Sequence, residues 1–261
     1  MGLIAYSHGG RQGDIIYSLF ACRQYAKNQP FDFYLQTDIR DEHDPSNRGV
    51  LQTPTEAAFL ASILREQSYI RKLTIGDADY IPDRDVSVYI NLDQFRWIPQ
   101  IYEYSEIRYW YTRVLDIKDL DVFTPVFTIP YSDQPATDKL CICFTERYQP
   151  LIDPAVLKPF ADQLVFMGLS KEHEHFCKEY FPVEYHPVTS LLELLQFVQH
   201  SKGWCSNISG NYAAMEASAL PRILCLPGGL SHGDVRCYCP NGKAVLDNHK
   251  LVDAVEALLS K

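Results

Sequence analysis

The sequence lacks any run of about 18 apolar residues, so none of its 261 residues is expected to lie in a membrane-spanning segment. Its first eight residues have no basic flank and lead directly into a strand-like run, which argues against a secretory signal. Lys and Arg form no cluster, and the net charge of −9 repels nucleic-acid backbones. We therefore expect a cytoplasmic protein, with peripheral attachment to an inner membrane left open, and no nucleic-acid polymer as a partner.

Cysteine and glycine patterns exclude further classes of site. The eight cysteines are scattered and several lie in apolar runs, so we interpret them as reduced core residues. Cys237 and Cys239 lack the second pair that a tetrahedral zinc site needs. The loop that starts at Gly9 does not fit G-x-G-x-x-G, so a dinucleotide-binding fingerprint is not supported.

The sequence does contain a repeated alternation of strand-like and helix-like segments. Strands are expected at 2–6, 31–36, 71–75, 86–92, 140–144, 164–167, 183–185, 204–206 and 223–226, and helices at 14–26, 53–65, 102–111, 154–160, 171–180, 190–200, 210–220 and 248–260. The proline-rich segment 125–135 has the composition of a linker. We predict an α/β protein with two Rossmann-like lobes, residues 1–132 and 133–261, and a ligand cleft between them.

The first candidate loop runs from Gly9 to Asp14, between a strand and a helix. Its glycines allow the backbone to approach a ligand closely, and a helix start offers free N–H groups. Asp14 is also consistent with a plain helix N-cap. His8 precedes the loop, and it is either a contact for phosphate or acceptor or a residue without function.

Two loops in the second half of the chain have similar character. The segment from Ser206 to Asn211 leads from a strand into a helix start, where hydroxyl, amide and N–H donors favour a pyrophosphate, although a simple capped turn is the alternative. The segment from Phe144 to Tyr148 follows another strand. There Arg147 could make a forked contact to phosphate, and Tyr148 offers a ring for a base or sugar. All three loops follow strands, at the end where open α/β sheets bind ligands.

These segments resemble heptosyltransferase-type GT-B glycosyltransferases, and they are nearer to an uncharacterised bacterial and phage subgroup. Gly13 to Leu19 is similar to the family's Gly-Asp entry motif, and Ser209 to Pro221 is similar to its donor-site helix. Phe166 to Glu172 resembles a family strand that ends in glycine, here Gly168, before an acidic helix. Leu191 to His200 resembles the helix that precedes the donor loop. The resemblance covers most of the chain.

The resemblance implies a GT-B enzyme that moves a sugar from a nucleoside-diphosphate sugar to a hydroxyl acceptor, with inversion, without a metal ion and without a cofactor. Asp14 would be the catalytic base of an amino-terminal acceptor lobe. The carboxy-terminal lobe would bind the donor through Arg147, Tyr148, Gly168, Asn207, Ser209, Gly210, Asn211 and Glu216. The acceptor or phosphate side would include His8, Gly10, Arg11 and Gly13. Ile208 and Ala213 replace an acid and a histidine of the family, so the donor sugar stays open.

Other functions remain possible on the sequence alone. A nucleotide-sugar epimerase or a non-catalytic nucleotide- or sugar-binding protein could use the same scaffold. A serine or cysteine hydrolase is less favoured, because Ser206 and Ser209 have no histidine partner visible in the sequence. A group of aromatic residues could stack on a sugar acceptor, but core packing is the better interpretation for Tyr102, Tyr104, Tyr109, Trp110 and Tyr111.

Overall fold

The computed structural model describes residues 2–40, 50–77, 79–99, 101, 106–227 and 236–261, without the side chain of Arg147. The described residues up to Thr128 form one compact unit, and those from Ile129 onward form a second. Each unit is built on a parallel sheet with helices, so the prediction of an α/β fold is confirmed.

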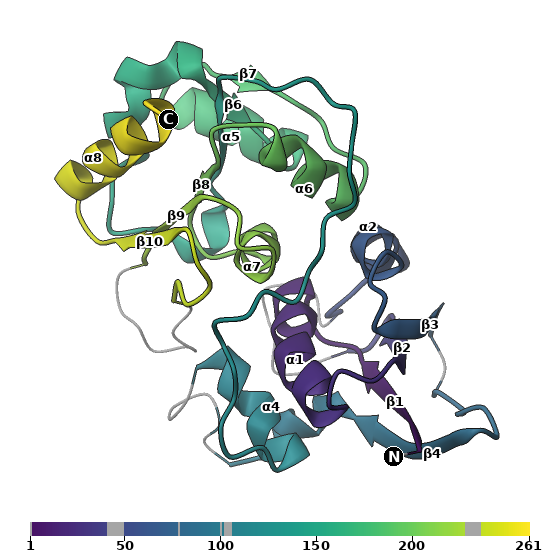
Figure 1. The fold of residues 1–261 in the computed structure, drawn as a ribbon. Coiled ribbons are helices and arrows are strands. Elements are labelled where there is room, and N and C mark those ends of the chain that lie inside the picture. Colours follow the sequence, from purple (N-terminus) through teal and green to yellow (C-terminus); the bar gives the residue numbers. More distant parts are fainter. Residues whose placement is uncertain (1, 41–49, 78, 100, 102–105, 228–235) are drawn as a thin grey trace. The chain divides into compact units, whose positions relative to one another are not determined.

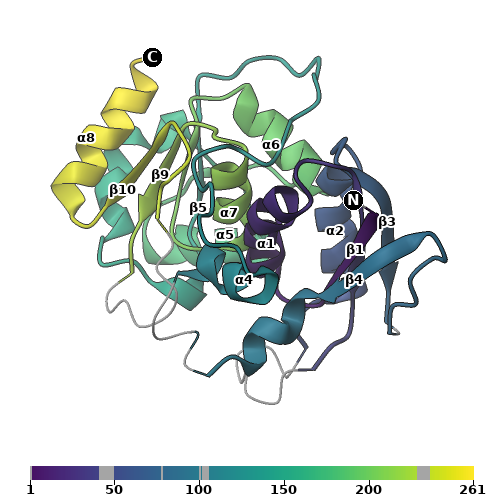
Figure 2. The same cartoon turned by 60° about the horizontal axis from the view of Figure 1, so that its bottom comes forward.

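The first unit has a four-stranded parallel sheet with the strand order β3-β2-β1-β4. Its strands are β1 (Leu3–His8), β2 (Phe31–Gln36), β3 (Ile70–Gly76) and β4 (Val86–Asn91). α1 (Gln12–Tyr25) connects β1 to β2, and α2 (Pro54–Leu64) connects β2 to β3. Because such crossovers are right-handed, both helices lie on the same face of the sheet, as Figure 2 shows.

Two helical segments complete this unit. The 3₁₀ helix η2 (Leu92–Trp97) follows β4 directly, and α4 (Ile107–Leu115) packs against α1 and η2. Trp110 and Tyr111 of α4 are buried, which confirms core packing for these two aromatic residues. Tyr109 is half-buried, and Tyr102 and Tyr104 lie outside the described residues.

The second unit has a six-stranded parallel sheet with the strand order β10-β9-β8-β5-β6-β7 (Figure 1). Its strands are β5 (Leu140–Cys143), β6 (Leu164–Phe166), β7 (Glu184–Tyr185), β8 (Trp204–Ser206), β9 (Arg222–Cys225) and β10 (Gly242–Val245). The helical segments are η3 (Glu146–Tyr148), η4 (Pro154–Gln163), α5 (Ser170–Glu179), α6 (Leu191–Gln199), α7 (Gly210–Ala217) and α8 (Asn248–Leu259).

The central strands of this sheet are buried along their whole length, as expected for a parallel sheet covered on both faces. Helices α6 and α7 pack against each other, and α8 packs against η4. Four cysteines, Cys141, Cys143, Cys205 and Cys225, are free thiols in the core strands, which confirms the interpretation of these residues.

The order of the strands reverses once in each sheet. In the first unit the chain runs outward from β1 to β3 and then returns to place β4 on the other side of β1. In the second unit it runs from β5 to β7 and returns to place β8 beside β5. Open α/β sheets bind ligands at the carboxyl ends of the strands that flank such a reversal. The loops after β1, β4, β5 and β8 are therefore the places to look for a site.

Candidate functional site

The loop after β1 turns directly into α1. The structure corrects the predicted start of this helix, because α1 begins at Gln12 rather than at Asp14, and Arg11 is its N-cap residue. Asp14 is the third helical residue, and its Oδ2 accepts the backbone N–H of Arg11 at 3.2 Å. A carboxylate in this position satisfies a free N–H of the first turn from inside the helix. Gly13 belongs to the same turn.

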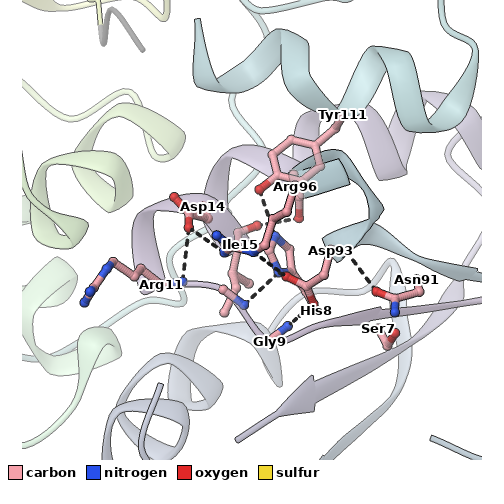
Figure 3. Close-up of polar contacts among 12 residues, drawn as sticks. Ser7, His8, Gly9, Arg11, Asp14, Ile15, Asn91, Asp93, Arg96 and Tyr111 are labelled. Carbon is pink, nitrogen blue, oxygen red and sulfur yellow. Dashed lines mark hydrogen bonds and ion pairs between the residues drawn. The ribbon is translucent and has the colours of Figure 1, made fainter. Parts of the chain in front are cut away.

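Asp93 connects the loop after β4 to the loop after β1 (Figure 3). Asn91 caps η2 by accepting the backbone N–H of Asp93 at 2.9 Å, which fixes the backbone of Asp93 at the start of η2. The Oδ2 atom of Asp93 then accepts the backbone N–H of Gly9 at 2.6 Å. The two residues are 84 positions apart in the sequence. This single side chain therefore fixes the two strand ends that flank the reversal.

His8, the last residue of β1, is fully buried beside Asp93. Its Nε2 lies 2.8 Å from the hydroxyl of Tyr111. Its Nδ1 lies 3.0 Å from the N–H of Gly10 and 3.2 Å from Oδ1 of Asp93. A neutral ring can accept from Gly10 at Nδ1, whereas a protonated ring donates to Asp93, so Nδ1 serves one of these partners at a time.

The charges around Asp93 keep it ionised. Burial alone would raise the pKa of Asp93, but the charge and hydrogen bond of His8, together with Arg96 and the N–H of Gly9, lower it to about 2. Burial and the nearby carboxylate of Asp14 raise the pKa of Tyr111 well above its usual value, so this hydroxyl stays protonated.

Arg96 joins Asp93 to Asp14. Its Nε lies 3.4 Å from Oδ1 of Asp93, and its Nη2 lies 3.3 Å from Oδ2 of Asp14. The guanidinium also stacks over the ring of Phe95, at 4.6 Å from the centroid. The side chains of Arg96 and Asp14 are 19% and 17% exposed, so solvent reaches the outer side of this pair.

Gly10 lies where the groups of this cluster converge. A Cβ atom on Gly10 would lie 2.6 Å from Cε1 of His8, 2.9 Å from Nη2 of Arg96 and 3.1 Å from Oδ2 of Asp14. No side chain fits there without displacing one of these groups. The structure thus brings the predicted residues His8, Gly10 and Asp14 together, whereas the guanidinium of Arg11 points away from His8 (Figure 3). Arg96 and Asp93 were not among the predicted site residues.

In the second unit, Asn207 connects the loop after β8 to the loop after β5. Its Oδ1 accepts the N–H of Thr145 at 3.0 Å, and its Nδ2 donates to the carbonyl oxygens of Thr145 and Tyr148 at 2.7 and 2.6 Å. The residue is fully buried. These contacts show that the Asn207 amide fixes the conformation of the 145–148 segment, and its predicted role in donor binding stays a prediction. Arg147 lies in η3, but its side chain is outside the described part of the chain.

The loop after β8 continues into α7. Ser209 is the N-cap residue, and its hydroxyl accepts the N–H of Tyr212 at 3.1 Å. Gly210 and Asn211 are the first two helical residues, and among the described residues their N–H groups have no hydrogen-bond partner. A helix start with two free N–H groups favours an anion.

Gly168 and Asn211 both lie beside Cys143, at the carboxyl end of β5. Burial raises the pKa of Cys143, the last residue of β5, and the neighbouring side chain of Asn211 partly offsets this effect. A Cβ atom on Gly168 would lie 2.9 Å from Sγ of Cys143 and 3.0 Å from Oε2 of Glu172. Glu172 was not predicted as a site residue. Its Oε2 accepts the N–H of Leu169 at 3.0 Å, and burial, with Glu146 adding to the effect, raises its pKa.

Comparison with solved structures identifies the architecture. A glycosyl transferase family 9 protein from Veillonella parvula is 11% identical, with 99% of this chain and 97% of that protein covered at a TM-score of 0.62. The E. coli heptosyltransferase WaaC with ADP is 11% identical, with 98% and 99% covered at a TM-score of 0.60. E. coli ADP-heptose LPS heptosyltransferase II is 13% identical, with 99% and 98% covered at a TM-score of 0.57. The chain has the GT-B fold. No protein-family model and no curated protein matches the sequence.

Within this GT-B fold, Glu216, which was predicted to contact the donor, has internal partners for its carboxylate. Glu216 is fully buried in an ion pair with Arg222. One carboxylate oxygen accepts from Nε of Arg222 at 2.6 Å, and the other accepts the N–H groups of Tyr238 and Cys239 at 2.8 and 3.0 Å. Both oxygens are therefore occupied inside the unit, and the position favours a role in holding α7 and the segment before β10 together.

Two short motifs in the sequence are typical of other kinds of site: Asp-x-Asp of metal binding and Gly-x-Ser-x-Gly of serine hydrolases. Asp-x-Asp occurs at 77–79 and 83–85, and Asp83 and Asp85 form ion pairs with Lys72 and Arg71. In the described residues, no three His, Cys, Asp or Glu side chains gather in a way that could hold a metal ion. Gly-x-Ser-x-Gly occurs at 229–233, outside the described residues.

The described helices include none with the length and apolar character needed to cross a bilayer.

Proposed function

We propose that the chain is a glycosyltransferase that moves a sugar from a nucleoside-diphosphate sugar to a hydroxyl acceptor. The observation that carries this proposal is the placement of Asp14, a partly exposed carboxylate beside the β1–β4 reversal of a GT-B fold. A base in such a place can take the proton of a hydroxyl nucleophile. The similar folds of the heptosyltransferases, one of them with ADP bound, support the class of donor.

In the proposed reaction, the oxygen of the acceptor attacks the anomeric carbon of the donor sugar. The bond between that carbon and the diphosphate oxygen breaks, and the electron pair leaves with the nucleoside diphosphate. Asp14 takes the proton of the acceptor hydroxyl. Attack from the side opposite the leaving group inverts the anomeric centre, as the resemblance implies.

The second unit would stabilise the leaving diphosphate. The free N–H groups of Gly210 and Asn211 at the start of α7 are fixed donors, which is the arrangement that stabilises developing negative charge. Arg147 and Tyr148 follow β5 in the neighbouring loop, which Asn207 holds in place. We propose that these groups act without a metal ion, so that EDTA leaves the rate unchanged.

Thermal shifts with UDP, GDP, ADP, CMP and their sugars would identify the donor. The donor that stabilises the protein would then be incubated with hydroxyl acceptors, and release of the nucleoside diphosphate would be measured. Asp14→Asn should keep the thermal shift and lower turnover by about 100-fold or more, because general-base catalysis contributes about 10²–10⁴-fold. Asp79→Asn, an exposed carboxylate of the same unit, is the matched control.

Three results would contradict the proposal. Turnover of the donor without any acceptor would favour an epimerase. A nucleotide-dependent thermal shift with no product from any acceptor would favour a non-catalytic binding protein. Full activity of Asp14→Asn would remove this residue from the mechanism.

A further inference from the structure

The contacts of Asp14 are distributed unequally between its two oxygens. The N–H of Arg11 and Nη2 of Arg96 both bind Oδ2, at 3.2 and 3.3 Å. Among the described residues, no hydrogen bond or ion pair reaches Oδ1. The carboxylate is thus held from one side, while its other oxygen keeps the capacity to accept a hydrogen bond.

Arg96 is itself held in place. Its Nε is paired with Asp93, whose other oxygen is anchored on the N–H of Gly9, and its guanidinium lies over Phe95. A guanidinium has several donors in one plane, so it can hold two carboxylates at the same time. The chain of contacts runs from the backbone after β1 through Asp93 and Arg96 to Asp14 (Figure 3).

From this geometry we infer that Arg96 is a positioning residue for Asp14, fixing Oδ2 so that Oδ1 is the atom that takes the proton of the acceptor. This inference rests on the proposed function. Its physical basis is that a base must lie within hydrogen-bond reach of its proton in the correct orientation, and a misplacement of about 1 Å can cost about 100-fold in rate.

The inference predicts a specific kinetic pattern for variants of Arg96. Arg96→Gln should lower kcat about 10- to 100-fold with little change in KM for the donor, because the donor is proposed to bind the second unit. Arg96→Lys keeps the charge but lacks the planar set of donors, so it should recover part of the loss. Arg113→Gln, an exposed arginine on α4, is the matched control and should behave like the unchanged protein.

A double-variant cycle separates positioning from a purely structural effect. If Arg96 acts through Asp14, adding Arg96→Gln to Asp14→Asn should cause little further loss of kcat. Gly10→Ala provides a second perturbation, because its methyl group would press on Arg96 and Asp14 while the chain keeps both side chains. It should also lower kcat more than it raises KM.

The outcomes distinguish this inference from the proposed function. No turnover by the unchanged protein with any donor and acceptor would refute the proposed function, and the inference with it. Turnover by the unchanged protein together with unaltered kcat in Arg96→Gln would overturn the inference alone. The inference would also be overturned if Arg96→Gln lowered kcat by the same factor in the unchanged protein and in the Asp14→Asn variant.

Discussion

Replacing Glu216 by Gln would remove one charge from an ion pair that both partners bury completely. The side chain keeps its size, so packing around it is preserved, but Arg222 becomes an uncompensated buried cation. Burial alone would lower the pKa of Arg222, yet the opposing charge of Glu216 holds it above the usual value. Neutralising Glu216 removes that support, but a guanidinium is not deprotonated in proteins, so Arg222 stays charged.

The expected loss follows from what Arg222 would retain. Its guanidinium still donates to the carbonyl oxygens of Leu220, Pro240 and Cys239, at 3.0, 2.7 and 2.7 Å. These dipoles solvate the cation only in part. Breaking a buried pair by removing one partner costs about 3–5 kcal/mol. We expect a loss in that range in the free energy of unfolding of the second unit. Removing both charges with Glu216→Met and Arg222→Met should cost less than the sum of the two single changes.

Urea unfolding followed by circular dichroism would measure the loss, and hydrogen exchange would localise it to peptides that contain α7 and β9. Glu256→Gln, an exposed glutamate on α8, is the control and should change the free energy of unfolding by no more than about 0.5 kcal/mol. A loss below about 1 kcal/mol for Glu216→Gln would refute the reasoning about the buried pair. Unchanged stability with weaker nucleotide binding would support the prediction that Glu216 contacts the donor.

Three further predictions test the loops. The pKa of Asp93 is lowered from 3.8 to about 2, so its pairing should contribute about 2 kcal/mol of stability above pH 4. This contribution should be lost as the pH falls towards 2. Unfolding measured over a series of acidic pH values should show the loss in the unchanged protein and not in Asp93→Asn. Gly10→Ala should lower the melting temperature because its Cβ would contact the confined ring of His8, and calorimetry would detect the shift. Asn207→Ala should cost about 1–3 kcal/mol in urea unfolding, because backbone groups of Thr145 lose their partner.

Much of the fold could be predicted from local pattern. The bounds expected for the strands at 31–36 and 204–206 match β2 and β8, because apolar runs end at clear breaks in the sequence. β10 was not expected, since its four residues lie at the edge of the sheet and two of them are exposed, so they show no apolar run. The cap of α1 was placed three residues late, at Asp14 instead of Arg11, because an acidic residue can serve a helix start equally well at the cap and at the third helical position.

The candidate site was predicted only in part, for a physical reason. The glycines, Ser209 and Asp14 could be predicted from the sequence, because they belong to local turns and helix starts. Asp93 and Arg96 contact residues of the first loop only because β4 pairs with β1. No local sequence pattern predicts that pairing, so these two residues were not predicted. From the sequence, Glu216 resembles a solvent-exposed helix residue. Its partner, Arg222, lies in β9 beyond the end of α7, so the helix pattern does not indicate the ion pair.

The two units hold their candidate loops by the same device. In each, a buried polar side chain after one strand binds the backbone after the neighbouring strand: Asp93 binds Gly9, and Asn207 binds Thr145. Burying a polar group is costly unless it is hydrogen-bonded, so the side chain and the loop each stabilise the conformation of the other. Groups placed in advance do not need to reorganise during a reaction. Loss of activity in variants of Asp93 or Asn207 is therefore expected even though neither residue needs to touch a substrate, and contact with substrate must be established by competition or structure rather than by rate alone.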